Sequence, residues 1–248
     1  QFWIDRGGTF TAVVARRPNG VLSALKLLSE DPSRRTDAII EGIRRAMQLA
    51  SGSAIPTQEI DCVRIGTTVA TNALLTRGGE PTVLAITRGF RDALRIAYQN
   101  RPRLFDLNIV LPEQLYARII EIDERVGAHG DIVRALDDDG ARRALAAAYE
   151  AGFRSLAIVC MHAYRYPQHE QRVAQIAHAI GYTQISPSHE ISPLMKLVSR
   201  GDTTVADAYL SPLLRRYIDS VATQLPGTRV QFMQSNGGLA EARSFSGK

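Results

Sequence analysis

The sequence predicts an α/β protein that opens with an antiparallel β-hairpin. Residues 2–15 alternate and then run apolar, and Asn19-Gly20 supplies a turn before a second strand around residues 21–28. Farther along the chain, short apolar runs typical of buried strands alternate with segments of helical spacing. Of the 248 residues, 45% are hydrophobic and 22% are charged, which is ordinary for a soluble globular protein with a substantial core. Strands that alternate with helices favour an α/β architecture, here a mixed sheet flanked by helices.

Apolar spacing and the usual start and stop residues predict the helices. Thr67 or Thr68 can cap a helix that follows a strand. Pro212 should kink or divide the last helix, because proline lacks the N–H that a helix interior needs. Residues 98–117 are expected to be irregular. The other predicted helices span residues 38–50, 137–151, 167–180 and 203–224. One later strand begins at residues 62–65. The others cover residues 81–86, 118–126, 155–162, 183–186 and 229–234.

Charge and cysteine content exclude several classes of function. The 30 basic and 25 acidic residues give a net charge of +5, but they are interspersed, so we expect no nucleic-acid partner. An anionic small molecule fits the same balance. Cys62 and Cys160 have apolar neighbours and are predicted to be reduced core thiols. No apolar run reaches the length of a membrane span, so we expect a cytoplasmic protein with no membrane partner. The missing initiator methionine and the abrupt end suggest a trimmed segment.

The strongest functional motif is the opening hairpin. An apolar strand runs into Asp5, a double glycine at Gly7 and Gly8, and the hydroxyls of Thr9 and Thr11. Glycines let backbone N–H groups approach an anion and permit the positive φ angles that such turns often need. The threonines can donate hydrogen bonds, and the aspartate can hold a hydrated Mg²⁺ that bridges phosphates. The alternative is an ordinary Gly-Gly hairpin with a solvated aspartate.

Two further segments are weaker candidates. Gly66, Thr67 and Thr68 lie where a strand passes into a helix, and a helix N-terminus offers unpaired N–H donors to an anion. A plain threonine N-cap explains them as well. The turn at residues 235–238 follows a strand and could line a ligand or only reverse the chain.

Other catalytic patterns are missing from the sequence. The five histidines show no metal-ligand spacing, and the acidic run at residues 137–139 precedes a helix, where acids favour the N-terminus. The chain has no Gly-x-Ser-x-Gly elbow and no Walker-type glycine loop.

Taken together, the motifs resemble the hydantoinase A/5-oxoprolinase family, most closely its ATP-dependent 5-oxoprolinases. They run in family order over nearly the whole chain. The segments that carry the resemblance are residues 2–11 (FWIDRGGTFT), 26–30 (KLLSE), 64–75 (RIGTTVATNALL), 87–92 (TRGFRD), 99–102 (QNRP), 123–125 (DER), 189–193 (HEISP) and 234–238 (QSNGG).

The resemblance implies the N-terminal lobe of an actin-like ATPase. In that superfamily two ribonuclease H-like lobes clamp ATP, and each lobe gives a glycine-rich phosphate hairpin. The first hairpin resembles Asp5 to Thr11, whereas the second motif normally follows the turn at 235–238, beyond Lys248. We therefore expect an N-terminal domain at residues 1–198 and the truncated start of a hydantoinase A-type domain at 199–248.

The resemblance also implies an activity: the opening of 5-oxoproline to glutamate after ATP phosphorylates the lactam oxygen. ATP and Mg²⁺ would be the cofactors, with a C-terminal remainder or a hydantoinase B-type subunit as partner. Alternatives are an N-methylhydantoinase or acetone-carboxylase subunit, or a non-catalytic nucleotide-binding module. The last is favoured by Ala12, where the family usually has aspartate. We expect the isolated fragment to be inactive.

Site roles follow from the same resemblance. Asp5 would hold Mg²⁺. The substrate, a cyclic amide, would bind through the carboxylate that it carries itself. No catalytic residue is assigned. Phosphate contacts would come from Gly7, Gly8, Thr9, Thr11, Gly66, Thr67 and Thr68, and substrate contacts from Arg88, Arg91 and Arg101.

Overall fold

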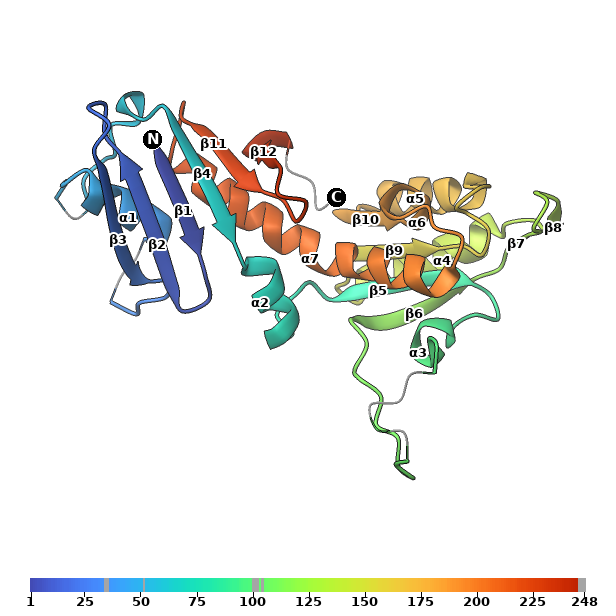
Figure 1. The fold of residues 1–248 in the computed structure, drawn as a ribbon. Coiled ribbons are helices and arrows are strands. Elements are labelled where there is room, and N and C mark those ends of the chain that lie inside the picture. Colours follow the sequence, from blue (N-terminus) through green and yellow to red (C-terminus); the bar gives the residue numbers. More distant parts are fainter. Residues whose placement is uncertain (34–35, 51, 100–102, 104, 245–248) are drawn as a thin grey trace. The chain divides into compact units, whose positions relative to one another are not determined.

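A computed structural model describes residues 1–33, 36–50, 52–99, 103 and 105–244 of the chain (Figure 1). Strands and helices alternate as predicted, so the α/β fold class is confirmed. The contacts divide the chain into two compact units: one holds Gln1–Gly78 with Leu213–Gly247, and the other holds Gly79–Pro212. None of the helices in the described part is long and apolar enough to cross a membrane.

The first unit is built on a six-stranded sheet with the order β12-β11-β4-β1-β2-β3. β2 runs antiparallel to β1 and β3, β4 and β11 run parallel to β1, and β12 returns antiparallel to β11. This is the mixed sheet that the sequence predicts. Its strands are β1 (Phe2–Arg6), β2 (Phe10–Arg16), β3 (Leu22–Leu28), β4 (Cys62–Thr67), β11 (Arg229–Met233) and β12 (Leu239–Glu241).

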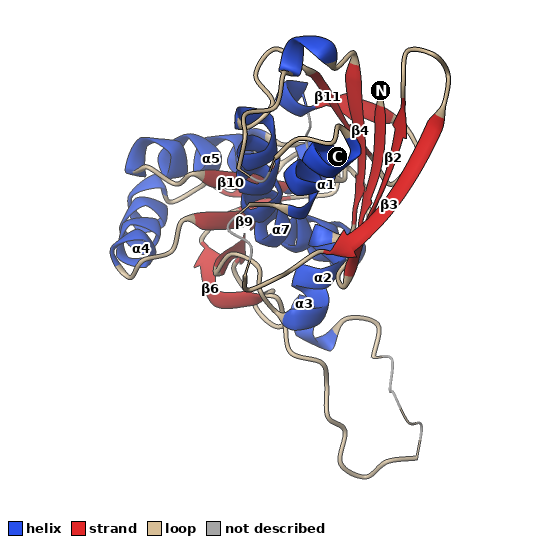
Figure 2. Cartoon of the chain, turned by 90° about the vertical axis from the view of Figure 1, so that its left-hand side faces the viewer, coloured by secondary structure: helices blue, strands red, loops and turns tan. Residues whose placement is uncertain are grey.

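One face of this sheet carries the core of the first unit (Figure 2). The helix α1 (Ala38–Ala46) packs on it, together with residues of α7 (Leu197–Thr223) that belong to this unit, such as Ile218 and Val221. Asp37 is the N-cap of α1, and its side chain accepts a hydrogen bond from the N–H of Ile39. The helix ends four residues earlier than predicted. Side chains alternate along a strand, so the burial of Phe2 and Ile4 places Asp5 on the other face of the sheet.

The second unit is built on a parallel sheet with the order β10-β9-β5-β6. Val83 and Ala85 of β5 pack with the helices α4 and α5, whereas Leu84 and Ile86 pack with Leu94 and with residues of α7. Both faces are therefore covered, as is usual for parallel sheets. The elements are β5 (Thr82–Thr87), α3 (Ala93–Ile96), β6 (Tyr116–Ile122), β7 (Arg125–Val126), β8 (Ile132–Arg134), α4 (Asp138–Glu150), β9 (Ser155–Val159), α5 (Gln168–Ile180), β10 (Gln184–Pro187) and α6 (Ser188–Ile191).

The helix α7 departs most from the prediction. It starts six residues early, at Leu197, and continues through Pro212. Of the two predicted effects of this proline, a kink or a division, the division is therefore wrong. Val205 and Ala208 are buried in the core of the second unit, and Ile218 and Val221 in that of the first. Burial on both sides of the proline offsets the loss of one backbone hydrogen bond.

The cysteine prediction is confirmed in its structural part. Cys62 and Cys160 are both buried and unbridged. The remaining elements are α2 (Val69–Thr76) and the 3₁₀ turns η1 (Thr57–Glu59) and η2 (Ala242–Ser244).

Candidate functional site

The opening hairpin closes tightly and leaves its tip exposed. The N–H of Gly7 donates to the carbonyl of Phe10 at 3.0 Å, directly beyond the pair formed by Arg6 and Thr11. Gly8 and Thr9 are exposed at the tip. Within the described part of the chain, no residue accepts a hydrogen bond from their main-chain N–H groups or from the Thr9 hydroxyl. These donors are therefore available to an anion.

The two glycines are needed for space rather than for an unusual backbone angle. Neither has the positive φ that the sequence argument allowed for. A Cβ on Gly7 would lie 3.0 Å from the carbonyl oxygen of Phe10, and one on Gly8 would lie 2.9 Å from the side-chain nitrogen of Asn72. The tip thus lies close to the Asn72 side chain of α2, which would have to shift to admit a side chain at Gly8.

Asp5 lies beside the hairpin on the exposed face of the sheet. It pairs with Ala12 across the antiparallel ladder and with Gly66 across the parallel one. A Cβ on Gly66 would come within 3.8 Å of an Asp5 carboxylate oxygen. Among the residues that the structure describes, none forms a hydrogen bond or ion pair with this carboxylate. It is an exposed acceptor, free for a cation.

The segment at Gly66, Thr67 and Thr68 meets the hairpin directly. The N–H of Thr68 donates to the carbonyl of Arg6 at 3.1 Å, because β4 continues alongside β1. Thr67 Oγ1 accepts from the N–H of Val69 at 3.3 Å, while the Thr68 side chain makes no such cap and accepts instead from the Asn72 amide at 3.3 Å. The N–H groups of residues 70 and 71 have no acceptor among the described residues. The start of α2 therefore presents free donors, as helix N-termini do.

Thr11 lies apart from these exposed groups. Its predicted contact with phosphate is therefore corrected to a structural role in the hairpin. Its side chain is fully buried, with Oγ1 2.9 Å from Ser29 Oγ. The Ser29 hydroxyl donates to the carbonyl of Gly7 at 2.7 Å, and its N–H donates to the carbonyl of Thr9 at 2.9 Å. Thr11 and Ser29 thus fasten the hairpin from its buried side.

The third candidate segment, residues 235–238, lies at the same end of the sheet. β11 runs parallel to β4, so the turn after Met233 follows the same end of the sheet as the hairpin tip and the start of α2 (Figure 1). Met233 Cε would lie 3.1 Å from a Cβ on Gly66. In the turn, Gly237 has a φ of +82°, and the N–H of Gly238 donates to Asn236 Oδ1. Ligands of α/β sheets bind at the carboxyl ends of strands, which is where the three segments meet.

The predicted substrate arginines have a different setting, within the second unit. Arg88 Nη1 lies 3.4 Å from Asp123, which Arg134 approaches more closely, at 2.7 Å. The hydrogen bond from Arg134 lowers the pKa of Asp123. Arg88 lines a depression of about 420 Å³ that Glu124 and Arg125 also line. Arg91 is exposed, and Arg101 lies outside the described residues.

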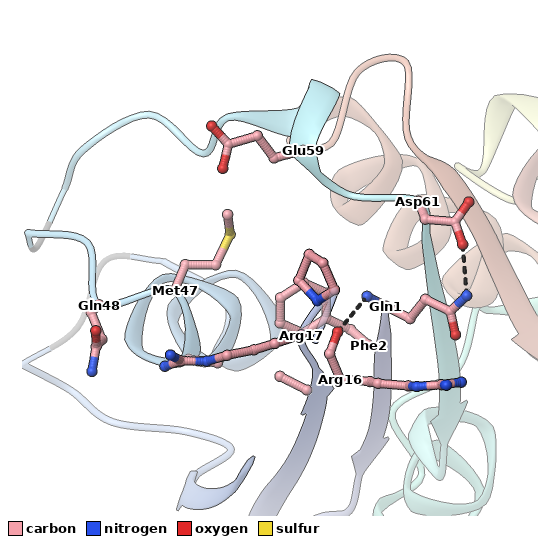
Figure 3. A pocket seen from close by; sticks show the side chains of 11 residues that line it. Gln1, Phe2, Arg16, Arg17, Met47, Gln48, Glu59 and Asp61 are labelled. Atoms are coloured by element: carbon pink, nitrogen blue, oxygen red, sulfur yellow. Dashed lines mark hydrogen bonds between the residues drawn. The ribbon is translucent and has the colours of Figure 1, made fainter. Parts of the chain in front are cut away.

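A cavity of about 790 Å³ lies at the opposite end of β1 from the hairpin tip (Figure 3). Gln1 Nε2 donates to Asp61 at 2.7 Å there, and the terminal amine donates to the carbonyl of Arg16. None of the predicted site residues lines this cavity, so its size does not mark it as the functional site.

Comparisons with known proteins give the chain its family. The family described as "Hydantoinase/oxoprolinase N-terminal region" matches residues 1–181, and "Hydantoinase/oxoprolinase" matches residues 200–248. The chain is 42% identical to 5-oxoprolinase 1 of Arabidopsis thaliana, over 100% of this chain and 22% of that protein. It is 38% identical to 5-oxoprolinase of Saccharomyces cerevisiae, over 98% of this chain and 22% of that protein. The chain thus spans about a fifth of the length of these relatives.

Solved structures agree in fold. The ATP-dependent caprolactamase from Pseudomonas jessenii superposes with a TM-score of 0.83 at 29% identity, over 97% of this chain and 36% of that one. Acetone carboxylase in its nucleotide-free structure gives a TM-score of 0.77 at 18% identity, over 98% of this chain and 37% of that one, and supports the fold alone. Because the first family match covers well over half of the sequence, this chain belongs to the hydantoinase/oxoprolinase family.

Proposed function

We propose that this chain is the N-terminal part of an ATP-dependent enzyme that opens the lactam of 5-oxoproline to glutamate. Relatives named 5-oxoprolinase, at 38–42% identity over nearly the whole chain, support the substrate. One structural observation carries the proposal. The exposed N–H donors of Gly8 and Thr9, the free donors at the start of α2 and the Asp5 carboxylate lie together at one edge of the sheet.

These residues fit the phosphates of ATP. Main-chain donors at a helix N-terminus and a glycine turn bind phosphate oxygens without a cationic side chain. Gly8 keeps the tip close to Asn72, so that the hairpin and α2 can contact the same phosphate chain. Thr68 and Asn72 would hold the start of α2 beside the hairpin. The Asn72 amide donates a hydrogen bond to the Thr68 hydroxyl, and the Thr68 N–H donates to the carbonyl of Arg6. Thr11 would act only by holding the hairpin.

Asp5 fits a magnesium ion that the protein shares with phosphate. The described residues hold no group of three or more histidine, cysteine or acidic side chains suited to a metal. Mg²⁺ usually keeps several waters and takes one or two carboxylates plus phosphate oxygens, so a single carboxylate suffices. Ala12 is the register partner of Asp5, so an aspartate at that position would add a second carboxylate beside it. When bound, the ion would neutralise phosphate charge.

ATP is needed because an unstrained lactam resists water. Amide resonance weakens the carbonyl as an electrophile, and phosphorylation of its oxygen removes that protection. The protein's part in such a transfer is to position the phosphates and to neutralise charge. We assign the hairpin edge to this task and a C-terminal remainder or a hydantoinase B-type subunit to the rest of the enzyme. The domain boundary near residue 198 remains our proposal, close to the start of α7.

Replacing Gly8 with alanine tests the phosphate site. The new Cβ would lie too close to the Asn72 amide, so either this amide leaves its contact with Thr68 or the tip shifts, and we expect Mg-ATP binding by the complete enzyme to weaken about tenfold, or about 1.4 kcal/mol. Gly78→Ala is the matched control, because a Cβ there meets only Thr76 Oγ1, at 3.4 Å. Isothermal titration measures both variants. Equal affinities for wild type and Gly8→Ala would contradict the assignment, and recovery in Gly8→Ala/Asn72→Ala would support the steric cause.

The substrate arginines need a separate measurement. We propose that Arg88, Arg91 and Arg101 bind the carboxylate of 5-oxoproline through charge-assisted hydrogen bonds, which are the strong class of such bonds. Arg91→Ala and Arg101→Ala should each raise the KM for 5-oxoproline about tenfold and leave the KM for ATP unchanged. Steady-state kinetics with either substrate varied checks this. An unchanged KM for 5-oxoproline in both variants would remove these residues from the substrate site.

One observation favours a second candidate function. Ala12 leaves Asp5 with no acidic partner in the opposite strand, which suits a module that binds nucleotide without turning it over. Such a module would bind Mg-ATP and release no ADP with lactam, hydantoin or ketone.

A further inference from the structure

A lysine beside the hairpin is not used by the phosphate site proposed above. Lys26 belongs to β3, the edge strand that pairs with β2 (Figure 2). It opens the segment at residues 26–30, which carries part of the family resemblance, and Ser29 of that segment fastens the hairpin from its buried side. The lysine and the hairpin belong to the same compact unit, so the contacts within that unit place them relative to each other.

Strand register places this lysine in one row with the proposed magnesium ligand. Asp5 of β1 is paired with Ala12 of β2, and Ala12 is paired in turn with Lys26 of β3. Because Val13 and Leu27, which adjoin the row in sequence, are buried, the row itself lies on the exposed face of the sheet. A carboxylate, a methyl group and an ammonium group therefore follow one another across this face.

The spacing of the row suits a phosphate group. Neighbouring strands lie about 4.8 Å apart, so the backbones of Asp5 and Lys26 are about 10 Å apart. Ala12, between them, is exposed and has only a methyl side chain, so the space above it is open. A phosphate there can contact the ammonium group on one side and a cation held by Asp5 on the other.

The Lys26 side chain is directed toward the hairpin tip. Its Nζ lies 4.2 Å from the centroid of the Phe10 ring, and Phe10 is the first residue of β2 after the tip. The Phe10 carbonyl also closes the tip by accepting from the N–H of Gly7. The ring is 45% exposed, so it holds the ammonium group in a cation–π contact that stays open to solvent. The ammonium group thus borders the exposed N–H donors of Gly8 and Thr9.

The charge of this lysine is not neutralised by a carboxylate. Among the residues that the structure describes, none forms an ion pair or a hydrogen bond with the Lys26 ammonium group. An exposed cation–π contact is weak and leaves the three N–H groups of the ammonium free to donate. The main-chain donors of the tip carry no net charge, whereas the phosphates of ATP are anionic. Lysine is a common point charge for phosphate, and here it is directed at a group of free donors.

We propose that Lys26 binds a phosphate group of Mg-ATP at the hairpin, on the side of Ala12 away from Asp5; this rests on the function proposed above. The ammonium group donates hydrogen bonds to phosphate oxygens and offsets their charge. Phe10 keeps the ammonium group beside the tip. The main-chain N–H groups position the phosphates, and the lysine contributes the positive charge that those donors lack.

Lys26→Met in the complete enzyme is the main test. Methionine keeps an unbranched side chain beside Phe10 and removes the charge. We expect the Kd for Mg-ATP, measured by isothermal titration, to rise about 10–100-fold, the range for a lost hydrogen bond to a charged group. Lys26→Arg should stay within about threefold of wild type, because a guanidinium also donates to phosphate. The KM for 5-oxoproline should be unchanged in both variants.

Arg16→Met is the matched control. Arg16 is exposed on the same face of the same sheet, at the end of β2 remote from the tip. Its replacement removes the same charge, but exposed charges more than about 10 Å apart are largely screened at physiological salt. The Kd for Mg-ATP should therefore stay close to that of wild type.

Acetylation of lysine gives a readout that a structural role would not change. Only a free amine reacts with acetic anhydride, so a phosphate that occupies the ammonium group protects it. Saturating Mg-ATP should markedly slow the acetylation of Lys26, as followed by mass spectrometry. The same concentration of adenosine, which has no phosphate, should not slow it.

The outcomes keep this inference apart from the proposed function. Wild-type enzyme that binds no Mg-ATP would refute the phosphate site itself. With binding present, an unchanged Kd in Lys26→Met would overturn the role of Lys26, and so would equal losses in Lys26→Met and Arg16→Met. A weakened Kd in Lys26→Met, with no protection of Lys26 by Mg-ATP in the wild type, would also overturn it, in favour of a structural role.

Discussion

Asp5→Asn is expected to lower kcat/KM of the complete enzyme for ATP by about 10²–10³-fold, the size of a lost electrostatic contact in a reacting site. The Asp5 carboxylate is exposed, has no protein partner in the described structure and faces Gly66 across the ladder. Asparagine fills the same space without the charge, so the fold should be kept while the magnesium–phosphate complex loses its carboxylate.

Asp61→Asn is the matched control for this change. Asp61 is also exposed and precedes β4, but it lies at the opposite end of the sheet, where it accepts from Gln1. Its replacement should leave ATP turnover within about twofold of wild type, as for surface substitutions elsewhere. Titrating Mg²⁺ at fixed ATP completes the experiment: Asp5→Asn should need more Mg²⁺ for half-maximal rate. The same Mg²⁺ dependence and rate in both variants would exclude Asp5 from the metal site.

Arg200→Met is expected to be the most destabilising single change, lowering the free energy of unfolding by about 3–5 kcal/mol. Arg200 is fully buried at the start of α7. Its guanidinium donates to Ser188 Oγ at 2.9 Å and to the carbonyls of four residues, which are Cys160, Met161, Leu194 and Met195. Methionine fills much of the volume but leaves these buried acceptors, and the charge of nearby Glu170, without their cation.

Thermal melting checks the size of this effect. A loss of that order should lower the melting temperature by about 10 °C in a chain of this length. Arg172→Met is the control, because the Arg172–Asp138 pair is on the surface, where ion pairs contribute little. Arg200→Lys should rescue only part of the loss, since an ammonium cannot reproduce the forked contacts. Equal melting temperatures for Arg200→Met and Arg172→Met would contradict the claim that the buried hydrogen bonds of Arg200 stabilise the fold.

The features that the sequence predicted well are those set by neighbouring residues. Alternation along β1 and β2 and the Asn19-Gly20 turn, where Gly20 has a φ of +83°, are local signals, so the opening hairpin and the strand near residues 21–28 were predicted, although without separate bounds for β1 and β2. The capping aspartate of α4 is local too: Asp137 accepts from the N–H of Gly140. β8 and β12 were missed, since each has three residues and depends on its partner strand for its existence.

Side-chain roles were predicted less well, because they depend on residues distant in sequence. The Thr11 hydroxyl is hydrogen-bonded to Ser29, eighteen residues away, and a Cβ on Gly8 would crowd the distant Asn72 side chain. The contact between Glu124 and His169, at 2.7 Å, likewise joins residues that are forty-five positions apart. Pairing across a sheet brings such groups together, and no local pattern records it.

The most direct test of the central claim is the stoichiometry of ADP and glutamate formed by the complete enzyme from Mg-ATP and 5-oxoproline. The account predicts ADP release that depends on 5-oxoproline and yields one glutamate per ADP, with little release on hydantoin or acetone. ADP release that is stimulated by hydantoin or acetone but not by 5-oxoproline would contradict it. Nucleotide binding without ADP release on any of these three compounds would contradict it as well.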